Sequence, residues 1–464
     1  MDSEFDTGTL NERAVAMVAA VAQRNRLLDA SVRVEKFCQM ASAPLVFFRC
    51  TDYLFWQDLA ADPRQHEFGN AQTRTWVQGD LHIYKFGSTH DAKGKVGYGL
   101  SDFDEAVFSD YQFDLWRMAV SLVLLARQND DLSTGQQQRV VDAFVQTYLH
   151  TLRGCRQRAF LKAARFTRES TYGDLSHFLA RVEAQYSRQG MLDRWAPLVH
   201  AGKGGSRRKL SGSPLRRFDL AGRPDKLGEA SRGERDMIER AMAGYRKSVQ
   251  GSRAGQGGFF HVQDVARRFA AGTSTLGVPR YYVLVSGDRR DEFRLLDVKQ
   301  QTTPAPYEFL DQMASDEYRR AFGRNDALRY ATAGRALTAR TDPHLGWMEL
   351  DDGFYSVRER SPWKEAFPGE VLATRSAFTA MAEQWAEVTA TAHAQANKML
   401  PQRVHELTAG RDLDFCALVR EIAFNYADEV ETDHRAFRRA LTLPVGTCTG
   451  KAFAPPLYRD LLPR

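Results

Sequence analysis

The segment QGDLHIYKFGS, at residues 78–88, carries the side chains with the most distinctive chemistry in the chain. Asp80 and His82 follow RTWV, an apolar stretch that predicts a strand, so both side chains are expected in a loop at its end. A carboxylate in such a loop can orient or accept the proton of a hydroxyl that attacks a phosphate. Asp80 and His82 are therefore the candidate catalytic residues.

A second group of acids lies in the segment SDFDEA. Asp102 and Asp104 end the predicted strand KVGYGLSDFD at residues 95–104, and two neighbouring strands would bring them next to Asp80. Carboxylate oxygens grouped in this way hold Mg²⁺, which bridges substrate phosphates. We therefore predict Asp102 and Asp104 as metal ligands, although acids at strand ends often only solvate turns or cap helices.

A glycine-containing turn precedes another predicted strand in AAGTSTLGVPRYYVLV, at residues 270–285. Its small residues Gly272, Ser274 and Gly277 would let backbone N–H groups approach phosphate oxygens. Lys299 ends the following strand, in LLDVKQQ, which is how kinases place the lysine that contacts the α- and β-phosphates. Each feature alone is common, but their order predicts that all four residues bind a nucleotide.

Composition sets broad limits on the protein. The chain has 464 residues, of which 43% are hydrophobic and 26% charged, as expected of a soluble globular protein. It has no apolar run of about 18 residues that would span a membrane. Its start lacks a secretory signal, and its five scattered cysteines lack metal-ligand spacing, so we expect a cytoplasmic protein without structural zinc. The net charge of +6 is compatible with an anionic substrate such as a nucleotide.

The pattern of elements predicts an α+β protein with two lobes. Helical periodicity flanks a β-rich region, whose hairpins are RYYVLVSGDRRDEFRLLDVKQ at 280–300 and WMELDDGFYSVRER at 347–360. We divide the chain into an N-terminal helical segment (1–70), the catalytic-loop part of a larger helical lobe (71–250), a β-rich nucleotide-binding lobe (251–365) and C-terminal helices that complete the larger lobe (366–464).

These segments, taken in order, resemble the catalytic part of aminoglycoside-phosphotransferase-like kinases. Over nearly the whole chain they also resemble a mostly bacterial family known as domain of unknown function 2252. The second resemblance is carried by GDLHIYKFGS, LSDFDEAV, FDLWRMAVSL, RRKLSG, AAGTSTLGVPRYYVLV, DVKQ, FYSVRER and YADEVETDHRAF. It implies a protein-kinase-like fold that binds ATP with Mg²⁺.

The order of the motifs differs from that of ordinary kinases, in which the glycine-rich turn and the lysine precede the catalytic loop. Here they follow it, and the helix around His393 resembles the one that usually runs just before the catalytic Gly-Asp. We therefore predict a circularly permuted kinase-like fold with extra N-terminal helices, an arrangement that closely spaced termini make feasible. His393 itself is predicted to be a packed or capping residue.

Lys85 departs from the kinase-like pattern, which has asparagine at that place. An asparagine oxygen can bind Mg²⁺, whereas an ammonium group has donors only. Lys85 could replace the charge of a metal and touch a phosphate of the nucleotide, or it could abolish catalysis and leave nucleotide binding. The acid that pairs with Lys299 is also open, with Glu308, Asp311 and Glu317 as candidates.

Three classes of function follow. The first is an ATP-dependent phosphotransferase with an unknown acceptor, of which nucleotidyl transfer is a variant. The second is a nucleotide-binding regulatory protein without turnover. The third, a nucleic-acid binder, is not favoured, because the basic segment at 201–228 lacks the interleaved aromatic residues of a stacking platform. The cations that motivate it are Lys203, Arg207, Arg208, Lys209, Arg216 and Arg217.

Overall fold

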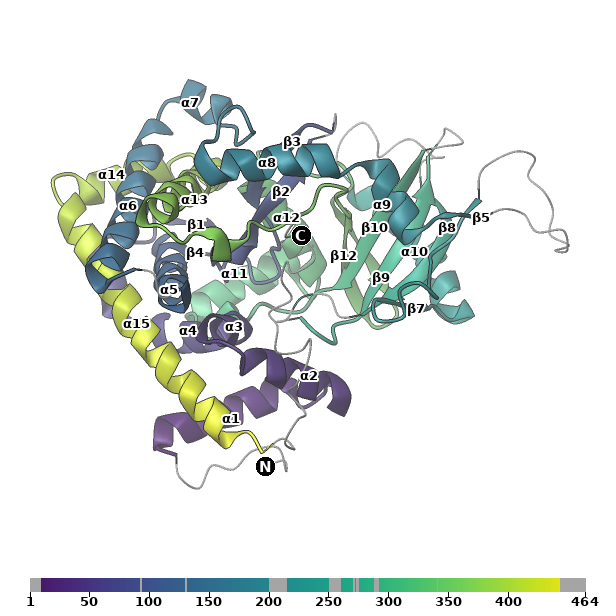
Figure 1. Ribbon diagram of the computed structural model, residues 1–464, viewed down its shortest axis with the longest axis horizontal. Coiled ribbons are helices and arrows are strands. Elements are labelled where there is room, and N and C mark those ends of the chain that lie inside the picture. The colour runs from purple at the N-terminus through teal and green to yellow at the C-terminus, as the bar shows by residue number, and fades with distance from the viewer. Residues whose placement is uncertain are drawn as a thin grey trace, which may run out of the picture.

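The computed structural model describes most of the chain. The described residues are 10–91, 94–129, 132–199, 215–249, 260–269, 272, 275–287, 292–339 and 341–442. Figure 1 shows a helical part on one side and an antiparallel sheet on the other, so the predicted α+β class is confirmed. None of the helices in the described part of the chain is long and apolar enough to cross a membrane.

The helical part is assembled from both halves of the chain. Helix α5 (Gln112–Asn129) is buried along almost its whole length, which explains why its sequence is apolar all round. Helices from the C-terminal region pack around it and its neighbour, α13 against α6 and α15 against both α5 and α6. Their bounds are α6 Thr134–Gly154, α13 Arg375–Ala396, α14 Leu400–Thr408 and α15 Asp412–Ala440.

Shorter helices cover this body. The N-terminal ones contribute Phe37, Phe47 and Trp56 to the same hydrophobic core. Their bounds are α1 Glu12–Asn25, α2 Ala30–Met40, α3 Pro44–Cys50 and α4 Asp52–Leu59, and further along the chain lie α7 Arg158–Ala163, α8 Gly173–Gln185 and α9 Arg188–Trp195.

The larger sheet has six antiparallel strands in the order β11-β12-β10-β9-β8-β7. Both predicted hairpins, β9–β10 and β11–β12, are confirmed. The bounds are β7 Leu227–Glu229, β8 His261–Arg268, β9 Arg280–Ser286, β10 Phe293–Gln300, β11 Gly346–Leu350 and β12 Gly353–Glu359. Because β7 belongs to this sheet, the sheet begins upstream of residue 251.

Helices cover the sheet and also interrupt it in sequence. One core contains Ile238, Met242 and Tyr245 of α10 (Arg232–Ser248), and another contains Trp195 of α9 together with residues of β9 and β10. The segment between β10 and β11 forms α11 (Gln312–Phe322) and α12 (Asp326–Leu337), where we expected β-rich sequence. The sequence did not predict these two helices, because their amphipathic patterns are short and lie between segments with strong β-strand patterns.

Three smaller sheets complete the fold. Strand β1 (Arg74–Val77) pairs with β4 (Val107–Asp110), and β2 (Phe86–His90) pairs with β3 (Val96–Leu100). The third joins β5 (Leu198–Val199) and β6 (Leu215–Arg216). The strands that precede Asp80 and Asp102 were predicted to be neighbours, and this prediction is wrong, because each pairs with a different partner.

A buried polar junction links the two halves of the helical part. Asp114 of α5 accepts hydrogen bonds from the backbone N–H groups of Gln78 (2.7 Å) and Gly79 (3.0 Å), which lead into the Asp80 loop. His393 of α13 has its Nε2 3.1 Å from Asp114 Oδ2 and its Nδ1 2.9 Å from the Tyr148 hydroxyl. His393 is fully buried and has a packing role.

We expect Asp114→Ala to lower the free energy of unfolding by about 3 kcal/mol, because two buried N–H groups and an imidazole lose their acceptor. Asp236→Ala, at an exposed position of α10, should change it by less than about 0.5 kcal/mol. Urea denaturation followed by circular dichroism measures both. Equal midpoints for the two variants would contradict the proposed role of the junction.

Candidate functional site

Asp80 lies at the centre of a buried ionic cluster and is 2% exposed. Its Oδ1 accepts hydrogen bonds from two nitrogens of Arg117, Nε at 2.8 Å and Nη2. Its Oδ2 lies 3.1 Å from Lys85 Nζ and 3.6 Å from His82 Nε2. Burial alone would raise the pKa of Asp80, but the charges of Lys85 and Arg117 hold it well below its usual range. Asp80 is therefore a stable carboxylate with occupied oxygens.

Arg117 is the residue of this cluster that sequence reasoning missed. It belongs to α5, is fully buried and also donates from Nη2 to the carbonyl of Phe48 at 3.1 Å. A signal existed in the sequence, since Arg117 stands in the mostly apolar helix FDLWRMAVSLVLLA. A buried charge almost always has a partner, so this arginine implied a buried acid nearby.

His82 is a neutral imidazole in the same loop. Burial is the main cause that lowers its pKa to about 3. Its Nδ1 accepts a hydrogen bond from the backbone N–H of Tyr84 at 3.2 Å, which shapes the short turn Ile83–Lys85. His82 therefore supports the loop and lies beside Asp80 without carrying a charge.

Lys85 connects the Asp80 loop to the second acidic segment. Its Nζ lies 2.8 Å from Asp102 Oδ2 as well as 3.1 Å from Asp80, so one ammonium group bridges two carboxylates. Asp102 has φ +64°, the one positive value among the non-glycine residues that the structure describes. Its side chain is 32% exposed, unlike those of Asp80 and Lys85. Of the predicted catalytic and metal-binding carboxylates, Asp102 is the one that reaches a cavity.

Lys299 pairs with Asp104 Oδ2, while its Nζ is 4.0 Å from Asp102 Oδ1. The other oxygen of Asp104 accepts a hydrogen bond from Gln301 Nε2 at 2.9 Å. Both oxygens of Asp104 are thus engaged, which leaves Asp102 as the better placed metal ligand.

The three residues proposed as partners of Lys299 have other roles. Glu308 pairs with Arg24, Glu317 pairs with Arg74, and Asp311 caps α11. That expectation was wrong because the partner comes from a distant segment of the chain.

A cavity of about 270 Å³ lies beside this cluster. Asp102, Lys299 and Gly272 line it together with apolar side chains such as Tyr330 and Leu345. Gly272 has φ +85°, a left-handed conformation that favours glycine. The other predicted residues of the glycine turn contribute differently: Gly277 faces Leu28 of the N-terminal region, and Ser274 lies outside the described residues.

The sheet side of this cavity carries several cations. Arg280 of β9 forms two hydrogen bonds with Asp297 of β10, and Arg358 of β12 lies 3.4 Å from the same carboxylate. These two arginines hold the pKa of Asp297 well below its usual range, against the effect of burial. Lys364, in the segment after β12, lines the same cavity.

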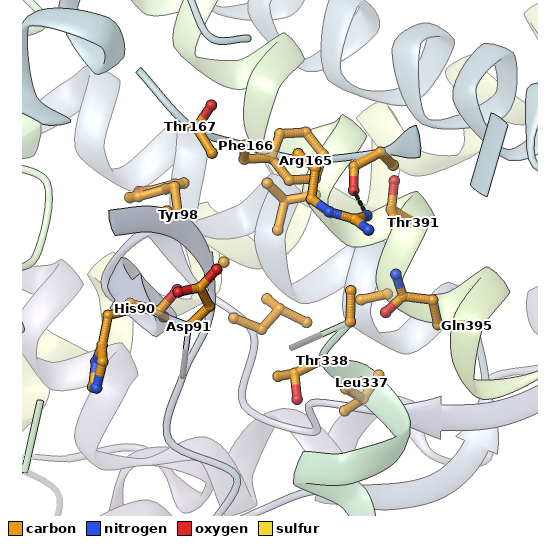
Figure 2. Close-up of a pocket in the computed structure, with 18 of the residues that line it drawn as sticks. His90, Asp91, Tyr98, Arg165, Phe166, Thr167, Leu337, Thr338, Thr391 and Gln395 are labelled. Atoms are coloured by element: carbon orange, nitrogen blue, oxygen red, sulfur yellow. Dashed lines mark hydrogen bonds between the residues drawn. The ribbon is translucent and has the colours of Figure 1, made fainter. Parts of the chain in front are cut away.

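A second, smaller cavity of about 100 Å³ adjoins the first and shares Thr89, His90, Leu100 and Thr338 with it. Figure 2 shows Arg165 beside Thr391, with His90 and Asp91 across the space. It contains none of the predicted site residues, so the candidate site is the larger cavity.

Asp342, His344 and Glu359 form a compact group, and Asp342 and Glu359 line the larger cavity. Their donor atoms lie within 4.8 Å of one another, and His344 Nδ1 is 3.4 Å from Asp342 and 3.6 Å from Glu359. Glu359 also accepts a hydrogen bond from Arg188 at 3.0 Å, which balances its charge. Asp342 and His344 are two residues apart in the sequence, but nothing local indicates that Glu359 of β12 joins them.

The predicted nucleic-acid loop is only partly described. Arg216 is buried, donates to the carbonyl of Ala196 at 2.7 Å and pairs with Asp193, and Arg217 donates to the carbonyl of Gln263. These two cations serve internal packing. The four others, Lys203, Arg207, Arg208 and Lys209, lie outside the described residues.

Comparison with known proteins identifies the family. Residues 28–440 match the family described as an uncharacterized protein conserved in bacteria (DUF2252), and the chain belongs to it. No curated protein and no solved structure matched the chain.

Gly79 offers a test of how tightly the Asp80 loop is held. Its φ is +82°, and a Cβ there would lie 1.9 Å from the carbonyl oxygen of Glu105. We expect Gly79→Ala to cost more than about 3 kcal/mol of stability. Gly244→Ala, in open space on α10, should stabilise the protein by about 0.5–1 kcal/mol. Thermal melts of both variants measure the difference in stability. A Gly79→Ala protein as stable as the wild type would contradict the tight packing of the Asp80 loop.

Proposed function

We propose that this member of the DUF2252 family binds a magnesium nucleotide in the 270 Å³ cavity and transfers its phosphoryl group to an acceptor. One observation carries the proposal: Asp102, Gly272 and Lys299 come from distant segments and line the same cavity. Phosphoryl transfer depends mainly on positioning and on cations around the phosphates, so this convergence is the feature that the reaction needs.

The placement of Lys299 supports a nucleotide site. The glycine turn is followed by β9 and then by β10, which carries Lys299. The carboxylate of Asp104 pairs with its ammonium group. In kinases a comparable lysine on a strand is held by an acidic partner and contacts phosphates. Arg329 of α12 donates to the carbonyl of Phe103 at 2.5 Å, which ties the segment with Asp102 and Asp104 to a helix of the sheet region.

Asp102 fits a single Mg²⁺. It is a carboxylate partly exposed to the cavity, and Mg²⁺ usually takes one or two carboxylates and completes its shell with water and phosphate oxygens. Such an ion would offset the negative charge of the phosphates. Lys299 and Lys85, on either side of Asp102, would supply further positive charge to the same region.

The proposal includes a kinase-like, circularly permuted arrangement. It is supported by the contact of α13 with α6 and by the bond between His393 and Asp114, which places a C-terminal helix against the Asp80 loop. A lobe built from both ends of the chain is what a permutation would produce.

Nucleotide binding without turnover is the second candidate, and one observation favours it. Asp80 is buried and held by Arg117 and Lys85, so an acceptor hydroxyl has no access to it in this conformation. A regulatory protein would need the cavity that binds the nucleotide, but it would not need an accessible catalytic carboxylate.

Calorimetric titration of ATP, with and without Mg²⁺, tests the site. We expect magnesium-enhanced binding by the wild type and a loss of at least about tenfold in affinity for Lys299→Ala and for Asp102→Asn. Lys398→Ala, at an exposed position after α13, is the matched control and should bind as the wild type does. A folded wild-type protein that binds no ATP would remove the basis of both candidates.

Lys85→Asn separates the two candidates. The substitution frees Asp102 Oδ2 and restores a neutral oxygen, so it should make binding more dependent on Mg²⁺. Release of label from γ-labelled ATP, compared with α-labelled ATP, measures phosphoryl against nucleotidyl transfer. Turnover by the wild type supports the phosphotransferase, whereas turnover that appears only in Lys85→Asn supports the regulatory protein. Activity in neither protein, although both bind ATP, counts against the phosphotransferase and leaves nucleotide binding without turnover.

A further inference from the structure

Lys364 is an unusual lysine on the wall of the larger cavity. Its side chain is exposed and lines that cavity. No carboxylate oxygen of the described residues lies within 4.0 Å of its Nζ. Surface lysines are ordinarily solvated and have no specific role. The groups around Lys364 therefore decide whether it could bind a ligand.

Lys364 shares the cavity with two arginines of the sheet, Arg280 and Arg358. Arg358 of β12 and Arg280 of β9 each act on Lys364 as a like charge, more strongly than Asp102 or Asp297 of β10 acts on it as an opposite charge. Arg280 and Arg358 already share Asp297. Arg358 is the largest cause that lowers the pKa of Lys364 to about 7, and Arg280 adds to it. Positive groups gathered in this way repel one another unless an anion joins them.

The backbone around Lys364 is fixed. The next residue, Glu365, donates its N–H to Ser88 Oγ at 2.8 Å and accepts from the N–H of Ser88 at 2.9 Å. Ser88 Oγ also bonds the carbonyl of Trp363, on the other side of Lys364. The carboxylate of Glu365 is 3.1 Å from the Tyr186 hydroxyl, so the neighbouring acid is engaged elsewhere. A lysine on a clamped segment can bind a ligand with little cost of ordering its backbone.

We propose that Lys364, with Arg358 and Arg280 behind it, is a binding site for the polyphosphate chain of the ligand that enters the cavity. This inference rests on the proposed function and deepens it, because it names a phosphate-binding residue outside the glycine turn and Lys299. Lys364 is the group that contacts the anion. Arg280 and Arg358 are positioning residues, since Asp297 holds both of them.

Tripolyphosphate is the probe, because it carries the charge of the chain without a nucleoside. We expect calorimetric titration without added metal to show binding by wild-type protein and a loss of at least about tenfold in affinity for Lys364→Met. Lys364→Arg should keep the affinity within about threefold, because the charge remains. Lys398→Ala should leave it unchanged, and thermal melts establish that all four proteins are folded.

The outcomes separate this inference from the proposed function. Equal affinity of wild type and Lys364→Met, or no binding by folded wild type, overturns the assignment of Lys364 even if ATP is turned over. Binding that depends on Lys364, in a protein that turns over no nucleotide, upholds the assignment and counts against the phosphotransferase. Loss of binding in Lys364→Arg as well as in Lys364→Met would show that charge is not what the site needs, and would overturn the proposal.

Discussion

The buried charge of Asp80 is the constraint on which the rest of the site depends. Moving a carboxylate out of water costs several kcal/mol unless cations compensate it. Arg117 supplies one and Lys85 the other. Arg117 is itself held by the carbonyl of Phe48 and lies 4.0 Å from the ring of Phe48, so α3, α5 and the loop after β1 keep one arrangement. The loop geometry around Gly79 follows from this arrangement.

The pairing of buried charges with charges of opposite sign continues from Asp80 across the molecule. Lys85 joins Asp80 to Asp102, and Lys299 joins Asp104 to the sheet. Each charge has a neighbour of opposite sign, and the sequence of pairs runs from the helical part through the segment 102–104 to β10. A ligand that adds charge near Asp102 therefore acts on both parts of the fold. Lys364 lies outside this alternation, and this is the reason that we propose it as a ligand contact.

Sequence patterns predicted local features, such as hairpins, better than contacts between residues that are distant in the sequence. The two hairpins of the larger sheet were predictable because Gly-Asp and Asp-Gly turns separate β-like runs. Motif order predicted that Asp102 and Lys299 would face one cavity. The Asp104–Lys299 pair was not predictable, since its members lie 195 residues apart and nothing local links Asp104 to Lys299. Lys364 had no signal for the same reason: its character comes from Arg358 and Arg280, which only the folded sheet brings near it.

Under the proposed function, Lys85 links ligand binding at Asp102 to the access of an acceptor to Asp80. Lys85 and a metal ion would compete for the same oxygen of Asp102. If a metal ion bound this oxygen, the oxygen would carry less negative charge and would attract the ammonium group of Lys85 less strongly. Under the proposed function, a Mg²⁺ nucleotide at Asp102 would weaken the hold of Asp102 on Lys85. Lys85 also shields Asp80, so its displacement is the step that would expose the carboxylate to an acceptor. The buried pair seen here would then allow turnover only if ligand binding moves Lys85, and a fixed Lys85 would correspond to the second candidate, nucleotide binding without turnover.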